Sequence, residues 1–230
     1  MIVGSGSEPS RERVVGALAD LLVGSYPGRV LRVAVDGPDA AGKTTLADEL
    51  AGGIADRGRP VIRASVDGFH QPRAVRRRRG SLSPQGYFLD AFDYTALRRL
   101  LLDPLGPGGD RRYRTAAFDF HHDCPLDGST REAPAEAVLL VDGVFLLRDE
   151  LRGCWDRTVF LQISPAASLR QALDRDVALF GSPAAVRERY QTRYLPGQEL
   201  YRAAAAPADH ADVLIDHERP QAPHVLRWPT

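Results

Sequence analysis

The amino-acid sequence predicts a three-layer α/β/α fold with a mostly parallel central sheet. Short apolar segments rich in β-branched residues alternate along the chain with longer segments of helical spacing. Two of these segments, residues 137–141 and 158–163, are strongly apolar, which is typical of strands covered on both faces. Because strand–helix–strand crossovers join parallel strands, the alternation favours a single sheet with helices on both sides.

The length and apolar content indicate one domain spanning residues 1–230. At 230 residues and 43% hydrophobic content, the chain can bury one sizeable core, alone or with a small appended lobe. No internal repeat divides it. We expect residues 1–10 to be a flexible polar lead, residues 165–205 to form arginine-containing lid helices, and residues 218–230 to be a polar tail.

Three helices and two strands are predicted in the first half of the chain. Apolar residues at helical spacing follow Ser10, which fits an N-cap, and Gly28 ends that pattern. In order, the expected elements are a helix over residues 11–23, a strand over 30–35, a loop over 37–42, a helix over 44–55, a strand over 61–66, an irregular segment over 68–90 and a helix over 94–102.

The second half begins with a turn cluster, Gly106-Pro-Gly-Gly109. Further strands and two helices follow it. In order, the expected elements are strands over residues 113–120, 137–141 and 158–163, helices over 166–179 and 183–194, and a short strand over 211–215.

The charge balance argues against nucleic-acid and membrane partners. Lys+Arg and Asp+Glu are 30 each, so the net charge is +0, whereas both kinds of partner need a basic excess. No stretch approaches the roughly 18 apolar residues that span a bilayer, and the N-terminus lacks a signal-peptide pattern. The two cysteines indicate neither a disulfide framework nor structural zinc. We therefore expect a cytoplasmic protein that acts on a small molecule; a homo-oligomer is left open.

One glycine-rich segment carries the most specific motif. Residues 37–44, Gly-Pro-Asp-Ala-Ala-Gly-Lys-Thr, fit G-x-x-x-x-G-K-[ST] between a predicted strand and a predicted helix. Backbone N–H groups of such a loop and the helix N-terminus bind phosphate oxygens. The chain has 29 Arg and a single Lys, and that Lys is Lys43. We therefore predict a P-loop NTPase fold whose nucleotide contacts are Gly37, Pro38, Asp39, Ala40, Ala41, Gly42, Lys43, Thr44 and Thr45.

Acidic residues end three predicted strands, and ligands of open α/β sheets bind outside these ends. Asp36 precedes the loop and can simply shape it. Asp142 occupies a Walker-B-like position, so we predict that it holds Mg²⁺ together with Thr44. Asp67 is predicted to accept the proton of an attacking hydroxyl or to help hold Mg²⁺. Ordinary strand-end turns are the alternative for both acids.

The residue inventory favours a kinase over a hydrolytic switch. An acid that faces the γ-phosphate suits transfer to a hydroxyl, with Lys43 on the phosphates. A GTPase switch would often carry a guanine-reading Asn/Thr-Lys-x-Asp segment, and this chain has no Asn and no second Lys. We expect a phosphotransferase that uses ATP or GTP with Mg²⁺.

Arginines on the predicted lid helices are candidates for stabilising the transferring phosphoryl group, because forked guanidinium groups suit its charge. We name Arg170 and Arg175 as catalytic candidates; Arg187, Arg189 and Arg193 lie on the same segment. The alternative is a set of solvated helix faces with acidic partners.

Candidate acceptor contacts come from histidines, aromatic residues and a basic run. We predict His70, Tyr87, Phe118 and His122, with surface histidines and core aromatics as the alternative. The run Arg76–Arg79 indicates a solvated loop, or one that binds an anionic substrate, rather than a nucleic-acid patch.

Together these motifs resemble the uridine kinase/phosphoribulokinase-like branch of P-loop kinases, which includes the bacterial pantothenate kinases. The resemblance covers roughly residues 30–217, and the phosphate loop is its most specific part. The motifs that carry it are Gly37–Thr44, Asp67-Gly-Phe-His70, Asp90-Ala-Phe-Asp93, Phe118-Asp-Phe120, Asp142-Gly143, Arg175-Asp176 and Ala211-Asp-Val-Leu-Ile215.

The resemblance implies Mg²⁺-dependent phosphorylation of a small-molecule hydroxyl by ATP or GTP. It implies that Asp67 is the base, that Asp142 supports the metal in place of the usual Glu, and that Arg175 lies in the lid. Two stretches depart from uridine kinases. Tyr87-Phe-Leu89 stands where they carry a ribose-binding Asp, and Gln171-Ala172 where they carry paired lid arginines.

The acceptor is the least defined part of this prediction. The first candidate is the 5′-hydroxyl of uridine or cytidine. A pantothenate- or sugar-kinase-like enzyme is the alternative, because the Asp-Gly-Phe-His segment and the basic loop at residues 76–80 look more like those relatives. A nucleotide-binding regulator without phosphotransfer is the alternative from another class.

Overall fold

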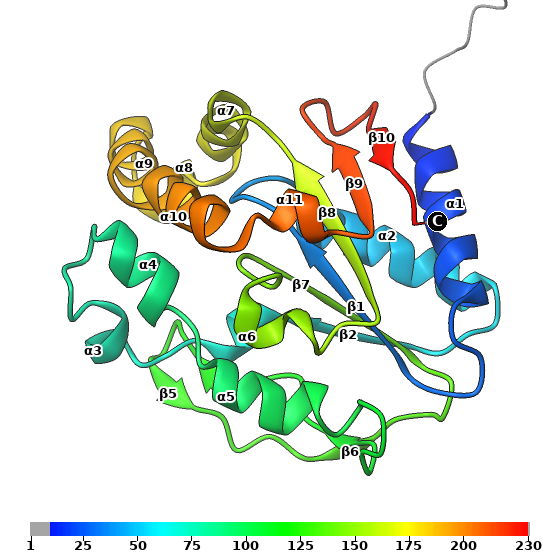
Figure 1. Cartoon of the computed structure of the whole chain (residues 1–230). Coiled ribbons are helices and arrows are strands. Elements are labelled where there is room, and N and C mark those ends of the chain that lie inside the picture. Colours follow the sequence, from blue (N-terminus) through cyan, green and yellow to red (C-terminus); the bar gives the residue numbers. More distant parts are fainter. Residues whose placement is uncertain (1–9, 230) are drawn as a thin grey trace, which may run out of the picture.

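The structure, a computed structural model, describes residues 10–229 and is built around one six-stranded sheet (Figure 1). Its strand order is β10-β9-β8-β1-β7-β2. All neighbouring strands pair in parallel except β9 and β10. The prediction of a mostly parallel sheet is confirmed. The strands are β1 (Leu31–Asp36), β2 (Val61–Ser65), β7 (Val138–Gly143), β8 (Arg157–Gln162), β9 (Val213–Asp216) and β10 (His224–Arg227).

Helices cover both faces of this sheet, so the three-layer prediction is confirmed as well (Figure 1). On one face, α1 (Arg11–Gly24) and α2 (Lys43–Asp56) pack against Val138 and Leu140 of β7. On the other, Leu139 and Val141 face a second core. That core is formed by α4 (Pro84–Asp90), α5 (Tyr94–Leu97), α6 (Asp149–Arg152) and α10 (Leu195–Ala205). Successive side chains of β7 thus point alternately into the two cores, which explains why β7 is buried along its whole length.

The structure confirms the predicted start of each helix on the first face. Ser10 is the N-cap of α1, and its hydroxyl accepts a hydrogen bond from the N–H of Arg13 at 3.4 Å. Gly42 precedes α2 with a φ of 83°, a left-handed conformation that suits glycine. The chain therefore turns directly from the phosphate loop into a helix whose first residue is Lys43.

The expectation of an irregular segment over residues 68–90 is wrong. It contains a 3₁₀ turn, η1 (Val66–Phe69), and the helices α3 (Arg73–Arg76) and α4. Ser83 caps α4 by accepting from the N–H of Gly86 at 3.0 Å, and Pro84 occupies the first turn. These helices are too short to produce a visible periodicity, but the Ser-Pro cap was a usable signal.

The strand predicted over residues 113–120 is also wrong. Two short ribbons lie outside the main sheet instead: β3 (Arg112–Tyr113) pairs with β6 (Arg131–Glu132), and β4 (Phe118–Asp119) pairs with β5 (Cys124–Pro125). The helix predicted over residues 94–102 is α5 followed by a π-helical turn, η2 (Arg98–Leu102).

The predicted lid segment is more broken than its periodicity indicated. The helix expected over residues 166–179 ends at Arg175 and restarts at Val177; the carboxylate of Asp176, between the two parts, accepts hydrogen bonds from Arg175 and Tyr190. Gly181, with a φ of 85°, ends the restarted helix. The segments are α7 (Pro165–Arg175), α8 (Val177–Phe180), α9 (Pro183–Arg189), a π-helical turn η3 (Tyr190–Tyr194), α10 and α11 (Pro207–His210).

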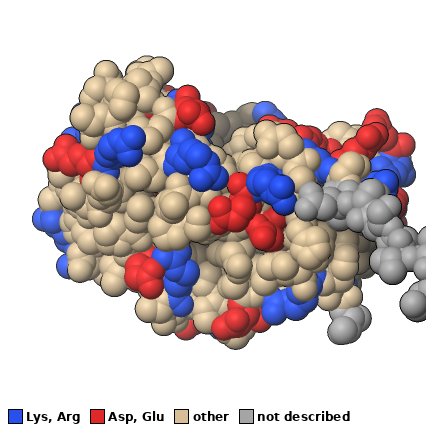
Figure 2. All heavy atoms as spheres, turned by 90° about the horizontal axis from the view of Figure 1, so that it is seen from above, with Lys and Arg blue, Asp and Glu red and all other residues tan. Residues whose placement is uncertain are grey.

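The tail predicted over residues 218–230 is more ordered than a polar tail suggests. Residues 1–9 of the expected lead lie outside the described residues. Part of the tail, β10, is an antiparallel edge strand of the main sheet. Within residues 10–229, no helix combines the length and apolar character needed to cross a membrane. On the face seen in Figure 2, basic and acidic side chains are interspersed, as the balanced composition leads one to expect.

Candidate active site

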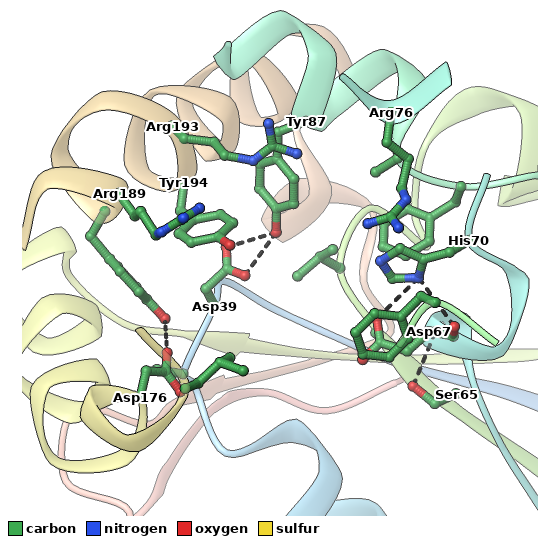
Figure 3. Close-up of a pocket in the computed structure, with 18 of the residues that line it drawn as sticks. Asp39, Ser65, Asp67, His70, Arg76, Tyr87, Asp176, Arg189, Arg193 and Tyr194 are labelled. Atoms are coloured by element: carbon green, nitrogen blue, oxygen red, sulfur yellow. Dashed lines mark hydrogen bonds and ion pairs between the residues drawn. The ribbon is translucent and has the colours of Figure 1, made fainter. Parts of the chain in front are cut away.

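A cavity of about 550 Å³ opens at the carboxyl ends of β1, β2 and β7. The phosphate loop and η1 form part of its wall, and α3, α4 and the helices after residue 165 form the rest. Figure 3 shows Asp67, His70 and Arg76 on one side, and Asp39, Tyr87 and Arg193 on the other. The fold therefore gathers most of the predicted site residues into one place.

Lys43 projects from the first turn of α2 into this cavity. Its ammonium group donates to the carbonyl oxygen of Pro38 at 2.6 Å. Burial lowers the pKa of Lys43, whereas the charges of Asp39 and Asp36 raise it. A lysine ammonium beside the N–H groups at the start of a helix is a chemically suitable partner for phosphate oxygens.

Asp36 ends β1 and is fully buried. Its carboxylate accepts hydrogen bonds from the N–H of Gly37 at 2.6 Å, the N–H of Leu147 at 3.0 Å and the hydroxyl of Tyr201. Burial raises its pKa to about 6. Asp36 therefore anchors the start of the phosphate loop to the core instead of meeting a ligand.

Thr44 and Asp142 meet where Mg²⁺ was predicted to bind. The Thr44 hydroxyl donates to one carboxylate oxygen of Asp142 at 2.7 Å, and Arg63 donates to the other at 2.9 Å. A hydroxyl and a carboxylate beside a phosphate loop fit Mg²⁺, which keeps most of its ligands as water and substrate phosphate. Among residues 10–229, no group of three or more His, Cys, Asp or Glu side chains is arranged to hold a metal ion.

Asp67 lies in the 3₁₀ turn that follows β2, and its N–H donates to the hydroxyl of Ser65 at 3.3 Å. Gly143 lets this turn approach β7, because a Cβ there would lie 2.3 Å from the Val66 side chain. The Asp67 side chain is 60% exposed to the open cavity. Even so, the surrounding protein desolvates the carboxylate and raises its pKa to about 6, against the pull of Lys43. A carboxylate with this pKa suits proton acceptance near neutral pH.

His70 closes the turn and faces the cavity. Its ring stacks on Phe120 at 4.7 Å between centroids and meets the edge of Phe92 at 4.6 Å. Its Nδ1 donates to the backbone carbonyl of Asp67 at 3.1 Å. Burial lowers the pKa of His70 to about 4, and the charges of Arg76 and Arg193 act in the same direction. The neutral ring therefore keeps Nε2 as a hydrogen-bond acceptor.

Asp39 of the phosphate loop has a role that the sequence did not reveal. The single hydroxyl proton of Tyr87 is shared between the two carboxylate oxygens of Asp39, at 2.7 and 2.9 Å, and the amide of Gln198 donates to one of them at 3.1 Å (Figure 3). Ser168 also donates to its backbone carbonyl at 2.8 Å. The loop is thus connected to α4, α7 and α10, which no local sequence signal could have indicated.

The lid arginines separate into two groups. Arg175 lines the cavity and donates to Asp176 at 2.6 and 3.1 Å, which raises the pKa of Arg175. Arg189 and Arg193 also line the cavity. Arg170, a predicted catalytic residue, is exposed and does not line it, and Arg187 is exposed as well.

Two predicted acceptor contacts also lie elsewhere. Phe118 is buried in the short ribbon, outside the cavity wall. His122 is 80% exposed and pairs with Asp119 at 2.6 Å, which raises the pKa of His122. Of the four predicted acceptor residues, His70 and Tyr87 line the cavity.

A second cavity of about 510 Å³ adjoins the first and shares Ala40, Lys43, Thr44 and Arg175 with it. Arg11 and the segment Pro220–Gln221 complete its wall. Nearby, the Nδ1 of His217 donates to the carbonyl of Ala41 at 2.8 Å, which supports the loop from below. Part of the predicted tail thus lies beside the phosphate loop.

Known proteins resemble this chain in structure, whereas sequence comparison finds no match. No protein-family model matches the sequence, and no curated protein sequence matches it. Solved structures do. A protein described as a possible uridine kinase from Bacillus stearothermophilus shares 20% identity over 87% of this chain and 96% of its own, with a TM-score of 0.69. A provisionally assigned fructose transport system kinase from Silicibacter sp. TM1040 shares 24% identity over 83% and 95%, with a TM-score of 0.68.

Phosphoribulokinase from Rhodobacter spheroides shares 14% identity over 81% of this chain and 70% of its own, with a TM-score of 0.58. The fold is that of the P-loop kinases. The resemblance predicted from the motifs is therefore confirmed for the fold. At these identities the likeness establishes the fold and not the activity of the protein.

Proposed function

We propose that the protein is an NTP-dependent phosphotransferase that moves the γ-phosphoryl group of ATP or GTP to a hydroxyl of a small molecule. The observation that carries the proposal is the convergence of Lys43, the Thr44–Asp142 pair and Asp67 in one cavity. These groups supply a phosphate contact, a metal position and a proton acceptor, which are the parts that phosphoryl transfer needs.

In the proposed reaction, the acceptor oxygen forms a bond to the γ-phosphorus as the bond between that phosphorus and the β–γ bridging oxygen breaks. Asp67 accepts the hydroxyl proton, and the nucleoside diphosphate leaves. Lys43 stabilises the charge on the phosphate oxygens. Mg²⁺, held by Thr44 and Asp142, would supply further charge neutralisation when bound. The chain's own contribution is mainly positioning and electrostatics.

The second cavity is the position we assign to the nucleoside of the donor, because it continues from the phosphate loop. Arg175 borders both cavities and is held by Asp176. We assign it to the transferring phosphoryl group. Closure of the helices after residue 165 would exclude water from this group and limit hydrolysis.

Uridine or cytidine remains the first candidate acceptor from the motif resemblance, with pantothenate or a sugar as the alternative. A regulator that binds NTP without transferring phosphate is the competing function from another class. It predicts NTP binding without acceptor-dependent turnover.

NTP consumption against a panel of uridine, cytidine, other nucleosides, pantothenate, ribose and fructose tests the proposal, with wild type beside Asp67→Asn. A kinase should lose about 100- to 10,000-fold in acceptor-dependent rate and keep its NTP affinity, because the amide cannot accept the proton. NTP binding with no stimulation by any acceptor, and no effect of Asp67→Asn, would contradict the proposal.

A further inference from the structure

We propose that the acceptor carries an anionic group, a carboxylate or a phosphate, which binds between Arg193 and the arginines of α3. The inference rests on the proposed function and narrows its substrate class. It divides the candidate acceptors, because pantothenate and sugar phosphates are anionic whereas uridine and free sugars are neutral.

Arg193 is the first observation. It is 9% exposed and lines the cavity. Its guanidinium donates to the carbonyl of Ser81 at 2.8 Å and lies 5.3 Å from the centroid of the Tyr87 ring. Throughout residues 10–229, no acidic side chain pairs with it. Burial lowers the pKa of Arg193, and the charges of Arg189 and Arg77 act in the same direction. A buried cation without a counter-charge calls for an anion at this position.

The α3 helix supplies the opposite wall. Arg73 and Arg76 belong to α3 and Arg77 is its C-cap residue; all three line the cavity. Arg76 is 15% exposed; its guanidinium donates to the carbonyl of Gln71 at 2.7 Å and pairs with Asp123, which does not line the cavity, at 3.4 Å. Arg73 and Arg77 have no acidic partner for their side chains within the described part of the chain. Figure 3 shows Arg76 and Arg193 on opposite sides of the cavity.

The second half of the same basic run is used differently. Arg78 and Arg79 both donate to the buried carboxylate of Asp90, Arg79 at 2.8 Å, and neither lines the cavity. They join the α3–α4 connection to the core. Four consecutive arginines therefore divide into two that line the cavity, Arg76 and Arg77, and two that share the carboxylate of Asp90.

The acids of the cavity are already engaged and leave these arginines available. Asp142 pairs with Arg63, Asp176 with Arg175, and Asp39 accepts from Tyr87 and Gln198. Asp67 remains for the hydroxyl proton. An acceptor with its hydroxyl at Asp67, its middle beside His70 and its anion between the arginines would match this arrangement.

Binding of inorganic phosphate tests the inference without relying on turnover. The protein is first saturated with Mg²⁺ and a non-hydrolysable ATP analogue, so that the phosphate loop is occupied, and phosphate is then titrated by calorimetry. We expect binding that weakens at least about tenfold in Arg77→Gln and in Arg193→Met, and that weakens with salt. The matched control is Arg78→Gln, which removes the same charge one residue away and leaves Arg79 on Asp90; it should bind phosphate like wild type.

Arg77→Gln keeps the test valid if Arg193→Met fails to fold, because Arg77 is exposed. Absence of phosphate binding to the nucleotide-saturated protein, or equal binding by Arg77→Gln and Arg78→Gln, would overturn the inference. So would a loss of affinity for the ATP analogue in Arg193→Met, since it would assign that arginine to the donor.

Matched acceptor pairs provide the second test and separate carboxylate from phosphate: pantothenate with panthenol, glycerate with glycerol, and ribose 5-phosphate with ribose, beside uridine. We expect the anionic member of one pair to exceed its neutral partner by at least about tenfold in kcat/KM, with the excess lost in Arg77→Gln. Asp67-dependent turnover that favours uridine, or a neutral member over its anionic partner, would overturn the inference and leave the kinase proposal intact. Phosphate binding without any Asp67-dependent turnover would support the anion site and contradict the kinase.

Discussion

The two ends of the cavity are built in different ways. The end that we assign to the nucleotide consists of backbone and of side chains at the start of α2 or at the end of β7, namely Lys43, Thr44 and Asp142. The acceptor end consists of long side chains on short helices, above all Arg76 on α3 and Arg193 in the π-helical turn η3. One end is fixed by the sheet, whereas the other depends on how separate helices are placed against each other.

Under the proposed function, this difference would let the acceptor end change while the nucleotide end stays the same. Strand ends and a helix N-terminus bind phosphate in a way that needs few variable residues. Short helices with cationic side chains can change their charge and length without disturbing the sheet. Four tests of this contrast follow, ordered by the size of the expected effect.

Replacing Lys43 by Met should abolish the phosphate contact and keep the length of the side chain. We expect acceptor-dependent turnover to fall by about 100- to 1,000-fold, because a preorganised charge on the transferring group is lost. Steady-state kinetics at saturating NTP measures this. Phosphate binding at the acceptor end of the nucleotide-free protein should persist; a parallel loss there would mean that the two ends are one site.

Asp142→Asn should act on the metal and not on the acceptor. The amide keeps a hydrogen-bond acceptor for Thr44 but loses the negative charge that attracts Mg²⁺. We expect the Mg²⁺ concentration for half-maximal activity to rise by about 10- to 100-fold, with the acceptor KM unchanged. An unaltered Mg²⁺ dependence would remove Asp142 from the metal site.

The raised pKa of Asp67, about 6, predicts a pH dependence at the nucleotide end. The carboxylate accepts a proton only when ionised, so kcat/KM should rise about tenfold per pH unit below pH 6 and level off above it. Lys43 and Arg175 favour the ionised form, Asp142 and Asp39 oppose it, and His70 stays neutral in this range. The residual activity of Asp67→Asn should lack this rise; if it keeps the rise, the titrating group lies elsewhere.

Asp90→Asn should loosen the acceptor end through its architecture. Asp90 is buried beneath Arg78 and Arg79, and these arginines lower its pKa. We expect a loss of about 1–3 kcal/mol in the free energy of unfolding, measured by urea denaturation at neutral pH. Phosphate affinity at the acceptor end should fall with it, while NTP affinity should not. Since the folded-state pKa is lowered, the stabilisation by Asp90 in wild type should also fade as the pH drops through the acidic range.

Sequence reasoning recovered the main sheet and missed the small elements for identifiable reasons. Among the five parallel strands, β1, β7 and β8 are mostly apolar or β-branched runs, and β2 and β9 alternate buried with partly buried residues, so their patterns are visible locally. The helices α3 and α4 and the ribbon strands are a few residues long, which is too short for any periodicity to stand out. The break at Asp176 was missed because a carboxylate that pairs with Tyr190 looks, in sequence, like an ordinary exposed helix residue.

The sequence by itself determined the nucleotide end: residues 37–45, Asp67 and Asp142 follow strands or open a helix, so their neighbours in space are also near a readable motif. Only the tertiary structure decided which arginines face the cavity. It set Arg76 and Arg77 apart from Arg78 and Arg79, brought in Arg193 and left Arg170 exposed. The physical reason is the separation along the sequence between the residues that interact. Strand-end and helix-capping interactions act within a few residues, whereas the contacts that place the arginines of the cavity join segments more than a hundred residues apart, as in the hydrogen bond from Arg193 to the carbonyl of Ser81.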